Sequence, residues 1–319
     1  MPEPLLHVEQ LSKQFTTRRG TVRAVDDVSF SLATGETLAL VGESGSGKST
    51  VARAILRLIP ASGGAVHFRG TDVLAARRSR MRELRREMQI VFQDPYASLD
   101  PHMTIERALI EPFEIHAIGS RADRKTRAAA LLERVGLDSS MGRRFPREFS
   151  GGQRQRIAIA RAIALNPSLI VCDEAVSALD VSIQAQILNL LQELQTDLGL
   201  AYLFISHNLS VVRHCADRVA VLYLGRIVEL ATCADFFRTP RHPYSLSLLS
   251  AVPHPDPLIE RSRNRIVLKG ELPSPFSPPS GCAFRTRCWK AQGICASSVP
   301  LLTTASRGHN VACHFPEDV

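Results

Sequence analysis

The sequence lacks a long hydrophobic run. Hydrophobic residues make up 45% of its 319 residues, yet no apolar stretch reaches the roughly 20 residues that span a bilayer. The first ten residues, MPEPLLHVEQ, show no basic segment followed by an apolar core, so we expect no secretory signal. These absences predict a soluble protein that resides in the cytosol.

A convincing nucleic-acid-binding pattern is also missing. The net charge is +8, and its densest part is RRSRMRELRREM at residues 77–88. Met81, Leu84 and Met88 form a narrow apolar stripe there, and no aromatic residue lies among the arginines. A solvated helix face explains this pattern about as well as phosphate binding does, so we expect no nucleic-acid partner.

Composition changes at about residue 235. Eleven of the 19 prolines and four of the seven cysteines lie in the last 84 residues, whereas the earlier part alternates strand-like and helical patterns. The sequence therefore predicts two domains, residues 1–235 and residues 236–319. The second begins with two linker-like segments, TPRHPY and VPHPDP, and also contains the proline-rich segment PSPFSPPSG.

The first domain is expected to be α/β. Three segments are typical of antiparallel strands: LLHVEQL, VRAVDDVSFSL and AVHFRG. Four short apolar segments predict a mostly parallel sheet with intervening helices: TLALVG, QIVFQD, SLIVCD and AYLFIS. The stretch from about residue 105 to 164 is polar and helix-rich, which predicts a helical subdomain set into this core.

The most informative motif is GESGSGKST at residues 42–50. Backbone N–H groups of such a loop converge on phosphates, while Lys48 serves the β- and γ-phosphates, Ser49 ligates Mg²⁺ and Thr50 serves the α-phosphate. An apolar strand precedes the loop, and helical periodicity follows it until Pro60. The motif predicts nucleoside triphosphate binding by Gly42, Glu43, Ser44, Gly45, Ser46, Gly47, Lys48, Ser49 and Thr50.

Two further motifs narrow the class of P-loop protein. An apolar strand leads to Asp173 and Glu174, of which the first suits Mg²⁺ and the second can accept a proton from the attacking water. The segment EFSGGQRQR at residues 148–156 opens a helix whose N-terminus is a second anion site. Two anion sites in one chain require either two anionic partners or one shared phosphate.

With these motifs in this order, the chain resembles the ATP-binding subunit of an ATP-binding-cassette (ABC) transporter over essentially its whole length. The resemblance implies an α/β P-loop NTPase cassette with a RecA-like core, an antiparallel β subdomain, a helical subdomain and a small cysteine-containing C-terminal domain. It places Phe15 against adenine and His207 at the γ-phosphate. It also places Gln93 in the glutamine loop, which senses Mg²⁺ and the membrane partner, and Asp180 in the loop that crosses to the other subunit. The signature residues are Ser150, Gly151, Gly152 and Gln153.

The resemblance also implies a mechanism. ATP lies between the P-loop of one cassette and the signature of a second, identical or related, cassette; binding closes the pair, and hydrolysis with phosphate release reopens it. The implied Mg²⁺ ligands are Ser49, Gln93 and Asp173, and the implied catalytic residues are Glu174, His207 and Gln93.

The tail narrows the resemblance. His242-Pro243-Tyr244, GCAFRTRC and residues 311–314 resemble the C-terminal extension of importers for oligopeptides, dipeptides and related solutes such as nickel or glutathione. This implies two transmembrane permease subunits, an extracytoplasmic solute-binding protein and a peripheral position at the cytoplasmic face of the cell membrane. Two alternatives are a non-transport ABC ATPase acting on ribosomes or nucleic acid, and a nucleic-acid-stimulated motor, against which the signature argues.

Four cysteines of the tail form a candidate metal centre: Cys282, Cys288, Cys295 and Cys313. Gaps of five, six and seventeen residues exceed those usual between paired ligands of a zinc ribbon. Cys₄ ligation suits an iron–sulfur cluster, and the resemblance points to a four-iron, four-sulfur centre. Zinc is the second choice, with His314 as a stray ligand. The alternative is that the four cysteines are plain buried thiols. We expect such a centre to organise the extension and not the phosphate site.

Overall fold

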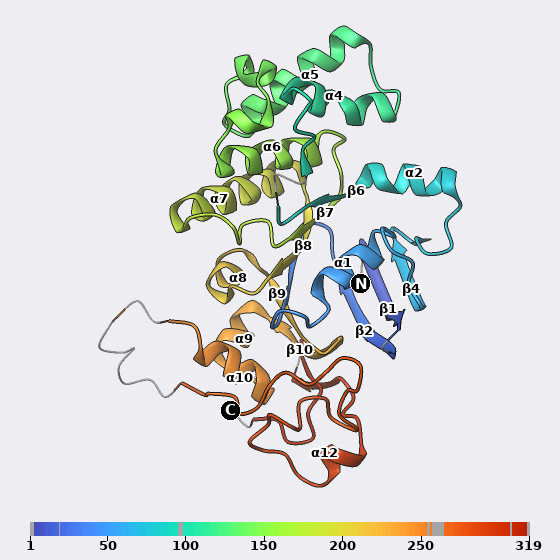
Figure 1. Ribbon diagram of the computed structural model, residues 1–319, viewed down its shortest axis with the longest axis vertical. Helices are drawn as coiled ribbons and strands as arrows, with labels where there is room; N and C mark the ends of the chain where they lie inside the picture. Colours follow the sequence, from blue (N-terminus) through green and yellow to red (C-terminus); the bar gives the residue numbers. More distant parts are fainter. Residues whose placement is uncertain are drawn as a thin grey trace. The chain divides into compact units, whose positions relative to one another are not determined.

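The computed structural model describes residues 3–18, 20–94, 98–253, 256, 265–306 and 308–317. The chain divides into two compact units, whose helices and strands are labelled in Figure 1. Unit 1 consists of residues 1–32, 37–74 and 206–319, and unit 2 consists of residues 33–36 and 75–205. The domain boundary expected at about residue 235 stays a prediction.

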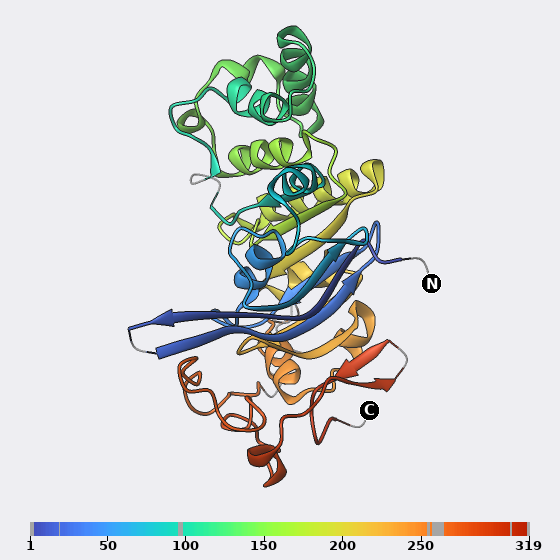
Figure 2. The same ribbon diagram turned by 90° about the vertical axis from the view of Figure 1, so that its right-hand side faces the viewer.

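Unit 1 contains an antiparallel sheet with the strand order β2-β1-β4-β5. Its strands are β1 (Leu6–Thr17), β2 (Gly20–Leu32), β4 (Gly63–Phe68) and β5 (Thr71–Asp72). Leu6 lies opposite Leu32 on one side and Phe68 on the other, and all three side chains are buried. Figure 2 shows β1 and β2 as a long two-stranded ribbon. The three antiparallel strands expected from the sequence are therefore confirmed.

Unit 1 also contains five strands in the order β11-β12-β10-β9-β3. They are β3 (Thr37–Val41), β9 (Arg218–Tyr223), β10 (Arg226–Thr232), β11 (Thr303–Ser306) and β12 (His309–Val311). β3 pairs parallel with β9, whereas β9 and β10 form an antiparallel hairpin that the sequence analysis missed. Its turn residues Leu224 and Gly225 both have positive φ, 44° and 81°, as a two-residue turn of type I′ requires.

The described residues of unit 1 include the helices α1 (Lys48–Ile55), α8 (Leu209–Cys215), α9 (Cys233–Arg238), α10 (Pro243–Ser250) and α12 (Ile294–Ser297). The helix expected to continue to Pro60 ends earlier, at Ile55, because Leu56 leaves the helical conformation and Arg57 has a φ of 51°. An apolar core joins β3 and β9 to α8, α9 and α10 through fully buried Tyr223, Phe236 and Tyr244.

The segment TPRHPY is not a linker, contrary to the sequence expectation. The Glu229 carboxylate of β10 is fully buried and accepts backbone N–H bonds from Arg241 at 2.8 Å and His242 at 2.9 Å. The His309 imidazole of β12 lies 2.6 Å from the same carboxylate. The His242 ring then caps α10 by accepting the Tyr244 N–H at 3.0 Å. Of VPHPDP, residues 254, 255 and 257 lie outside the described residues.

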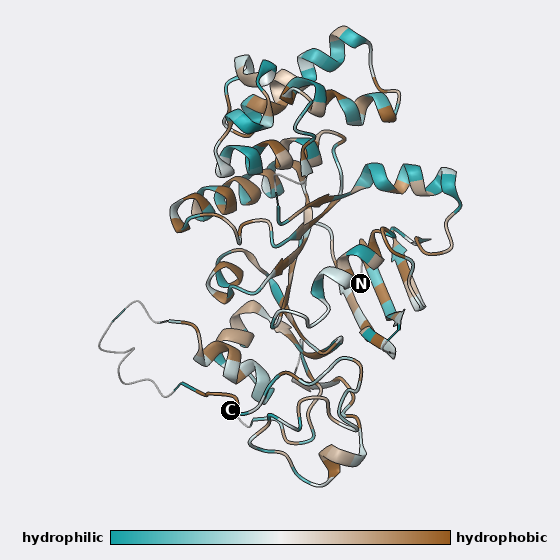
Figure 3. Cartoon of the chain, viewed as in Figure 1, coloured by the Kyte–Doolittle hydropathy of each residue, from teal (hydrophilic) through white to brown (hydrophobic). Residues whose placement is uncertain are grey.

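Unit 2 contains a parallel sheet with the order β8-β7-β6. Its strands are β6 (Met88–Val91), β7 (Leu169–Asp173) and β8 (Ala201–Ser206), the last ending at the unit boundary. Helix α2 (Arg78–Glu87) precedes β6 and is largely hydrophilic in Figure 3. Met81 and Leu84 of its expected stripe are buried, whereas Met88 belongs to β6.

The helix-rich segment of unit 2 is confirmed as helical. It contains α4 (Ile105–Ile115), α5 (Arg121–Arg134), the 3₁₀ helices η1 (Ser139–Arg143) and η2 (Pro146–Glu148), and α6 (Gly151–Ile163); α7 (Val181–Leu198) follows after β7. Its status as a separate subdomain stays a prediction. In the part of the chain that the structure describes, no helix has both the length and the apolar character needed to cross a membrane.

Candidate functional site

The phosphate-loop motif connects β3 to α1, and its glycines serve two different purposes. A Cβ atom at Gly42 would collide with the carbonyl oxygen of Leu222, and one at Gly47 would collide with that of Ala24. At Gly45 there is open space, but its φ of 80° is a conformation that other residues rarely adopt. The loop is therefore shaped partly by close packing against the chain's own backbone.

Lys48 is the first residue of α1 and is 5% exposed. Its Nζ donates hydrogen bonds to the carbonyl oxygens of Gly42 at 2.8 Å and Glu43 at 2.9 Å. The ammonium group thus lies within the loop, where phosphate oxygens would compete for its donors. Ser49 and Thr50 occupy the first turn of the same helix.

Glu43 ties the loop to the C-terminal extension. Its backbone N–H donates to the Tyr244 hydroxyl at 2.9 Å, and Arg287 Nη1 donates to both of its carboxylate oxygens at 3.0 and 3.1 Å. The extension therefore contacts the phosphate loop directly, while the expectation that a metal centre organises the extension and not the phosphate site stays a prediction. Sequence reasoning missed both contacts because the partners lie 201 and 244 positions away.

In unit 2, Asp173 and Glu174 lie at the end of β7, as expected. Asp173 is 3% exposed. Glu174 has a φ of 51°, and its N–H donates to the carbonyl oxygen of Ile205 at 3.1 Å. The Gln93 amide donates to the Glu174 carboxylate at 3.0 Å. The structure therefore brings these two predicted residues together, on a backbone conformation that costs energy for a residue with a Cβ.

The signature opens helix α6, and Ser150 is its N-cap. The Ser150 hydroxyl accepts the Gln153 N–H at 3.3 Å, while the Gln153 side-chain oxygen accepts the Ser150 N–H at 3.0 Å. This capping box satisfies two donors at the helix start. A Cβ at Gly152 would lie 2.6 Å from Ile183 of α7, whereas one at Gly151 would make an ordinary contact, at 3.6 Å, with Leu179.

The other predicted residues lie at element ends or on the surface. Asp180 is the N-cap of α7, and exposed His207 stands between β8 and α8. Phe15 is 38% exposed, and the Lys13 ammonium lies 4.7 Å from the centre of its ring. Unit 1 thus carries the P-loop, Phe15 and His207, and unit 2 carries Gln93, the two carboxylates, the signature and Asp180.

Comparisons with known proteins fit this arrangement. The family model for ABC transporters matches residues 25–177, and the model for the oligopeptide/dipeptide transporter C-terminal region matches residues 228–295. The oligopeptide transport ATP-binding protein AppF of Bacillus subtilis is 50% identical over 321 aligned residues, covering 98% of each chain. This chain belongs to the ABC transporter family. As a member it is an ATP-hydrolysing subunit with the α/β fold of the cassette.

Solved structures agree with the family assignment. The ATP-binding cassette MJ0796, in a dimeric post-hydrolysis state with ADP and Pi, is 28% identical and has a TM-score of 0.65, covering 72% of this chain and 98% of its own. The cbiO1 protein of Clostridium perfringens, part of an ABC transporter complex, is 25% identical with a TM-score of 0.66, covering 74% of this chain and 92% of its own.

The four cysteines of the C-terminal extension line one small cavity of about 10 Å³, together with Phe284 and His314. Burial, together with smaller contributions from the other three cysteines, raises the pKa of the Cys313 thiol to about 11. Burial also raises the pKa values of Cys282 and Cys288. Among the described residues, no three His, Cys, Asp or Glu side chains are arranged to hold a single metal ion.

Proposed function

We propose that residues 42–50 bind Mg-ATP and that Glu174 is the general base for its hydrolysis. The observation that carries this proposal is the Glu174 carboxylate, held by the Gln93 amide at 3.0 Å on a backbone with a φ of 51°. A strained residue of this kind is typical of functional sites. In this proposal Ser49, Gln93 and Asp173 hold Mg²⁺, because hydroxyl, amide and carboxylate oxygens are the ligands it prefers.

The remaining site residues have proposed contacts with the two ends of the bound nucleotide or with a second nucleotide. Phe15 stacks on adenine, and His207 contacts the γ-phosphate. Residues 150–153 and Asp180 serve the nucleotide bound by a second cassette, which is identical or related. The backbone donors at the start of α6 and the two glycines that follow the Ser150 N-cap support this role, because they allow close approach of an anion.

Replacing Glu174 by Gln tests the catalytic assignment. The amide keeps the shape of the carboxylate but accepts no proton, so hydrolysis should fall about 10²- to 10⁴-fold while ATP affinity persists. The matched control is Glu193→Gln, an exposed position on α7. Turnover near the wild-type rate in the assembled complex would remove Glu174 from the catalytic role.

We further propose that the ATPase drives import of peptides or a related solute. The support is the 50% identity to an oligopeptide transport ATP-binding protein along nearly the whole chain, and the match of residues 228–295 to the C-terminal region of oligopeptide and dipeptide transporters. The proposed partners are two permease subunits and an extracytoplasmic solute-binding protein, with this chain bound at the cytoplasmic face of the membrane. An ABC ATPase acting on ribosomes or nucleic acid is not favoured.

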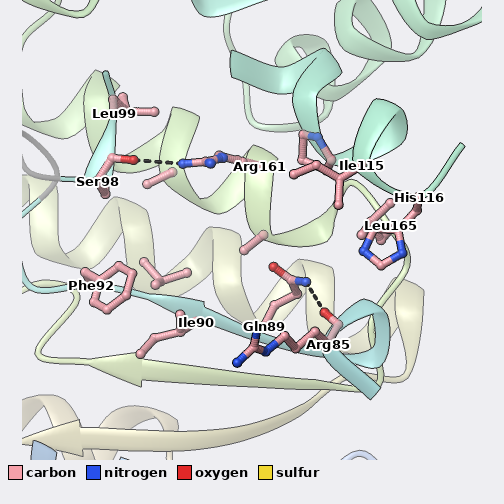
Figure 4. Close-up of a pocket in the computed structure, with 14 residues that line it drawn as sticks. Arg85, Gln89, Ile90, Phe92, Ser98, Leu99, Ile115, His116, Arg161 and Leu165 are labelled. Carbon is pink, nitrogen blue, oxygen red and sulfur yellow. Dashed lines mark hydrogen bonds between the residues drawn. The ribbon is translucent and has the colours of Figure 1, made fainter. Parts of the chain in front are cut away.

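A groove in unit 2 is the proposed docking surface for a permease. It has a volume of about 370 Å³ and is lined by side chains of β6, α4 and α6 (Figure 4). Its apolar lining includes Ile90, Leu99 and Leu165, while Arg85 and Arg161 line the same groove. An apolar segment that carries an acidic residue fits these walls. The groove also borders Phe92, the residue before Gln93, which links docking to the catalytic carboxylate.

Co-purification tests the docking surface. Ile115 lines the groove and is 51% exposed, so Ile115→Arg should abolish recovery of the permeases with the ATPase. Val267→Arg changes a residue of unit 1 that is 76% exposed and lies outside the groove, and it should leave recovery unchanged. Equal recovery with both variants would exclude the groove as the docking surface.

The cysteine-lined cavity is the proposed site of a four-iron, four-sulfur cluster in a separate C-terminal domain, residues 236–319. Four thiols on one cavity provide the Cys₄ donor set that such clusters use. In a tetrahedral zinc site with Zn–S bonds of about 2.3 Å, the sulfurs lie only about 3.8 Å apart. Zinc bound by the same four thiols is the second choice.

When bound, the cluster would cross-link four distant points of a segment with little apolar core. Cys282, Cys288, Cys295 and Cys313 would hold it as thiolates and release their protons on binding. Analysis of iron, sulfide and zinc in anaerobically purified protein tests this assignment. Iron and sulfide that are lost in Cys288→Ser support the cluster, one zinc per chain supports the second choice, and no metal leaves the thiols structural.

A further inference from the structure

Glu43 places a negative charge in the loop that binds a polyanion. Its carboxylate is met by Arg287, whose Nη1 donates to both oxygens at 3.0 and 3.1 Å. The Arg287 side chain is only 10% exposed and that of Glu43 30%, so solvent and salt screen this pair less than a surface ion pair. Arg287 therefore cancels a charge that would otherwise repel the phosphates at short range.

The backbone of Glu43 is held as firmly as its side chain. Its N–H donates outward to the Tyr244 hydroxyl at 2.9 Å, and its carbonyl oxygen accepts from Lys48 Nζ at 2.9 Å. Tyr244 cannot move easily, because its ring is fully buried against Tyr223, with ring centres 4.7 Å apart, and Phe284, with ring centres 5.4 Å apart. The N–H, the carbonyl and the carboxylate of Glu43 all have partners, and the extension supplies two of them.

We propose that Arg287 and Tyr244 of the C-terminal extension are positioning residues for the nucleotide, acting through Glu43 of the phosphate loop. Tyr244 fixes the curvature at the start of the loop, and Arg287 neutralises the loop's own carboxylate. This inference rests on the proposed nucleotide site at residues 42–50. It makes the extension part of the ATP-binding apparatus, and it predicts that damage to the extension lowers nucleotide affinity even though no extension residue need touch ATP.

The test measures Mg-ATP affinity with a fluorescent ATP analogue, and KM and kcat for hydrolysis, in the full chain. Arg287→Ala should weaken affinity about tenfold or more, because charge-assisted hydrogen bonds are lost and a carboxylate is left unpaired beside the phosphates. KM should rise while kcat stays near the wild-type value, because the interaction acts on bound ground state and transition state alike. Arg287→Lys should recover part of the loss, since it restores the charge without the planar fork.

The double variant Arg287→Ala/Glu43→Gln separates positioning from plain structure. If Arg287 acts by neutralising Glu43, removing the Glu43 charge should restore affinity to within about threefold of the wild type. If Arg287 only supports the fold of the extension, the double variant should bind as weakly as the single one, and this result would overturn the proposal. Arg285→Ala is the matched control, because the Arg285 guanidinium binds Ser280 and not the loop.

Tyr244→Phe keeps the proposal testable if Arg287 variants fail to fold. It preserves the ring packing and removes only the acceptor of the Glu43 N–H, so affinity should fall about fivefold while the chain still folds, with at most a fall of a few degrees in melting temperature. Wild-type affinity in Tyr244→Phe and Arg287→Ala, with Lys48→Ala still defective, would overturn this inference alone. Wild-type affinity in Lys48→Ala would instead overturn the proposed nucleotide site.

Discussion

Helices α1 and α6 both begin in motifs that we propose to bind phosphate, but their N-termini are built differently. The N-cap of α1 is Gly47, with a φ of 104° and no side-chain cap, and the charge of Lys48 follows directly. The N-cap of α6 is Ser150 in an extended conformation, closed by the reciprocal bonds with Gln153. The start of α1 therefore relies on loop geometry and a full charge, whereas that of α6 already satisfies two of its own donors.

The difference assigns the two helix starts different tasks. An anion at α6 competes with the capping box, so we expect α6 alone to bind phosphate weakly. An anion at α1 meets Lys48 and a loop that the rest of unit 1 holds in shape. We infer that α1 determines the nucleotide affinity of the isolated chain, and that α6 contributes only once a second cassette presents an already bound nucleotide.

The largest effect that distinguishes the two starts should come from adding one methyl group. Gly47→Ala forces a Cβ against the Ala24 carbonyl at a left-handed φ, so we expect about 2–5 kcal/mol of lost stability. Gly151→Ala at the start of α6 meets only Leu179, at 3.6 Å, and should change stability by less than about 0.5 kcal/mol. Chemical denaturation of both variants measures the two losses of stability. Equal losses would contradict the difference between the two helix starts.

Lowering the pH should lower the free energy of unfolding of unit 1. Burial lowers the pKa of His242 to about 4. The unfolded chain takes up that proton below about pH 6.5 and the folded chain does not, so stability falls as the pH drops from about 6.5 to 4, by about 3 kcal/mol in all. Denaturation at pH 7 and pH 4.5 measures this, with the fluorescence of Trp289, the single tryptophan, as the probe of unit 1. His242→Asn keeps a capping oxygen and should remove this part of the pH dependence.

The smallest effect concerns the capping box of α6. Ser150→Ala should cost about 1 kcal/mol of stability and also weaken ATP-driven closure, because Ser150 is both cap and proposed phosphate ligand. Gln153→Ala opens the same box and should cost a similar amount. If Ser150→Ala impairs closure more than Gln153→Ala, which removes the other half of the box and also belongs to the proposed signature, the serine has a role beyond capping; equal closure defects would give the two residues the same role.

The sequence predicted features whose causes are local. The loop at residues 42–50, the carboxylates after β7 and the start of α6 each depend on a few consecutive residues, and the structure places them at the expected element ends. The segment TPRHPY is typical of a linker by its prolines, but its backbone is held by Glu229, more than ten positions away. The pair of Glu43 and Arg287 depends on a tertiary contact that no local pattern records.

The most direct test of the account compares the Mg-ATP affinity of isolated Lys48→Ala and Gly151→Asp chains. Lys48→Ala should bind about 10- to 100-fold more weakly than the wild type, because a charge-assisted bond to phosphate is lost. Gly151→Asp places a carboxylate at the start of α6, where its Cβ fits, and should bind within about twofold of the wild type while failing to close with ATP. Equal loss of affinity in the two isolated chains would contradict the assignment of α1 to the chain's own nucleotide and of α6 to that of its partner.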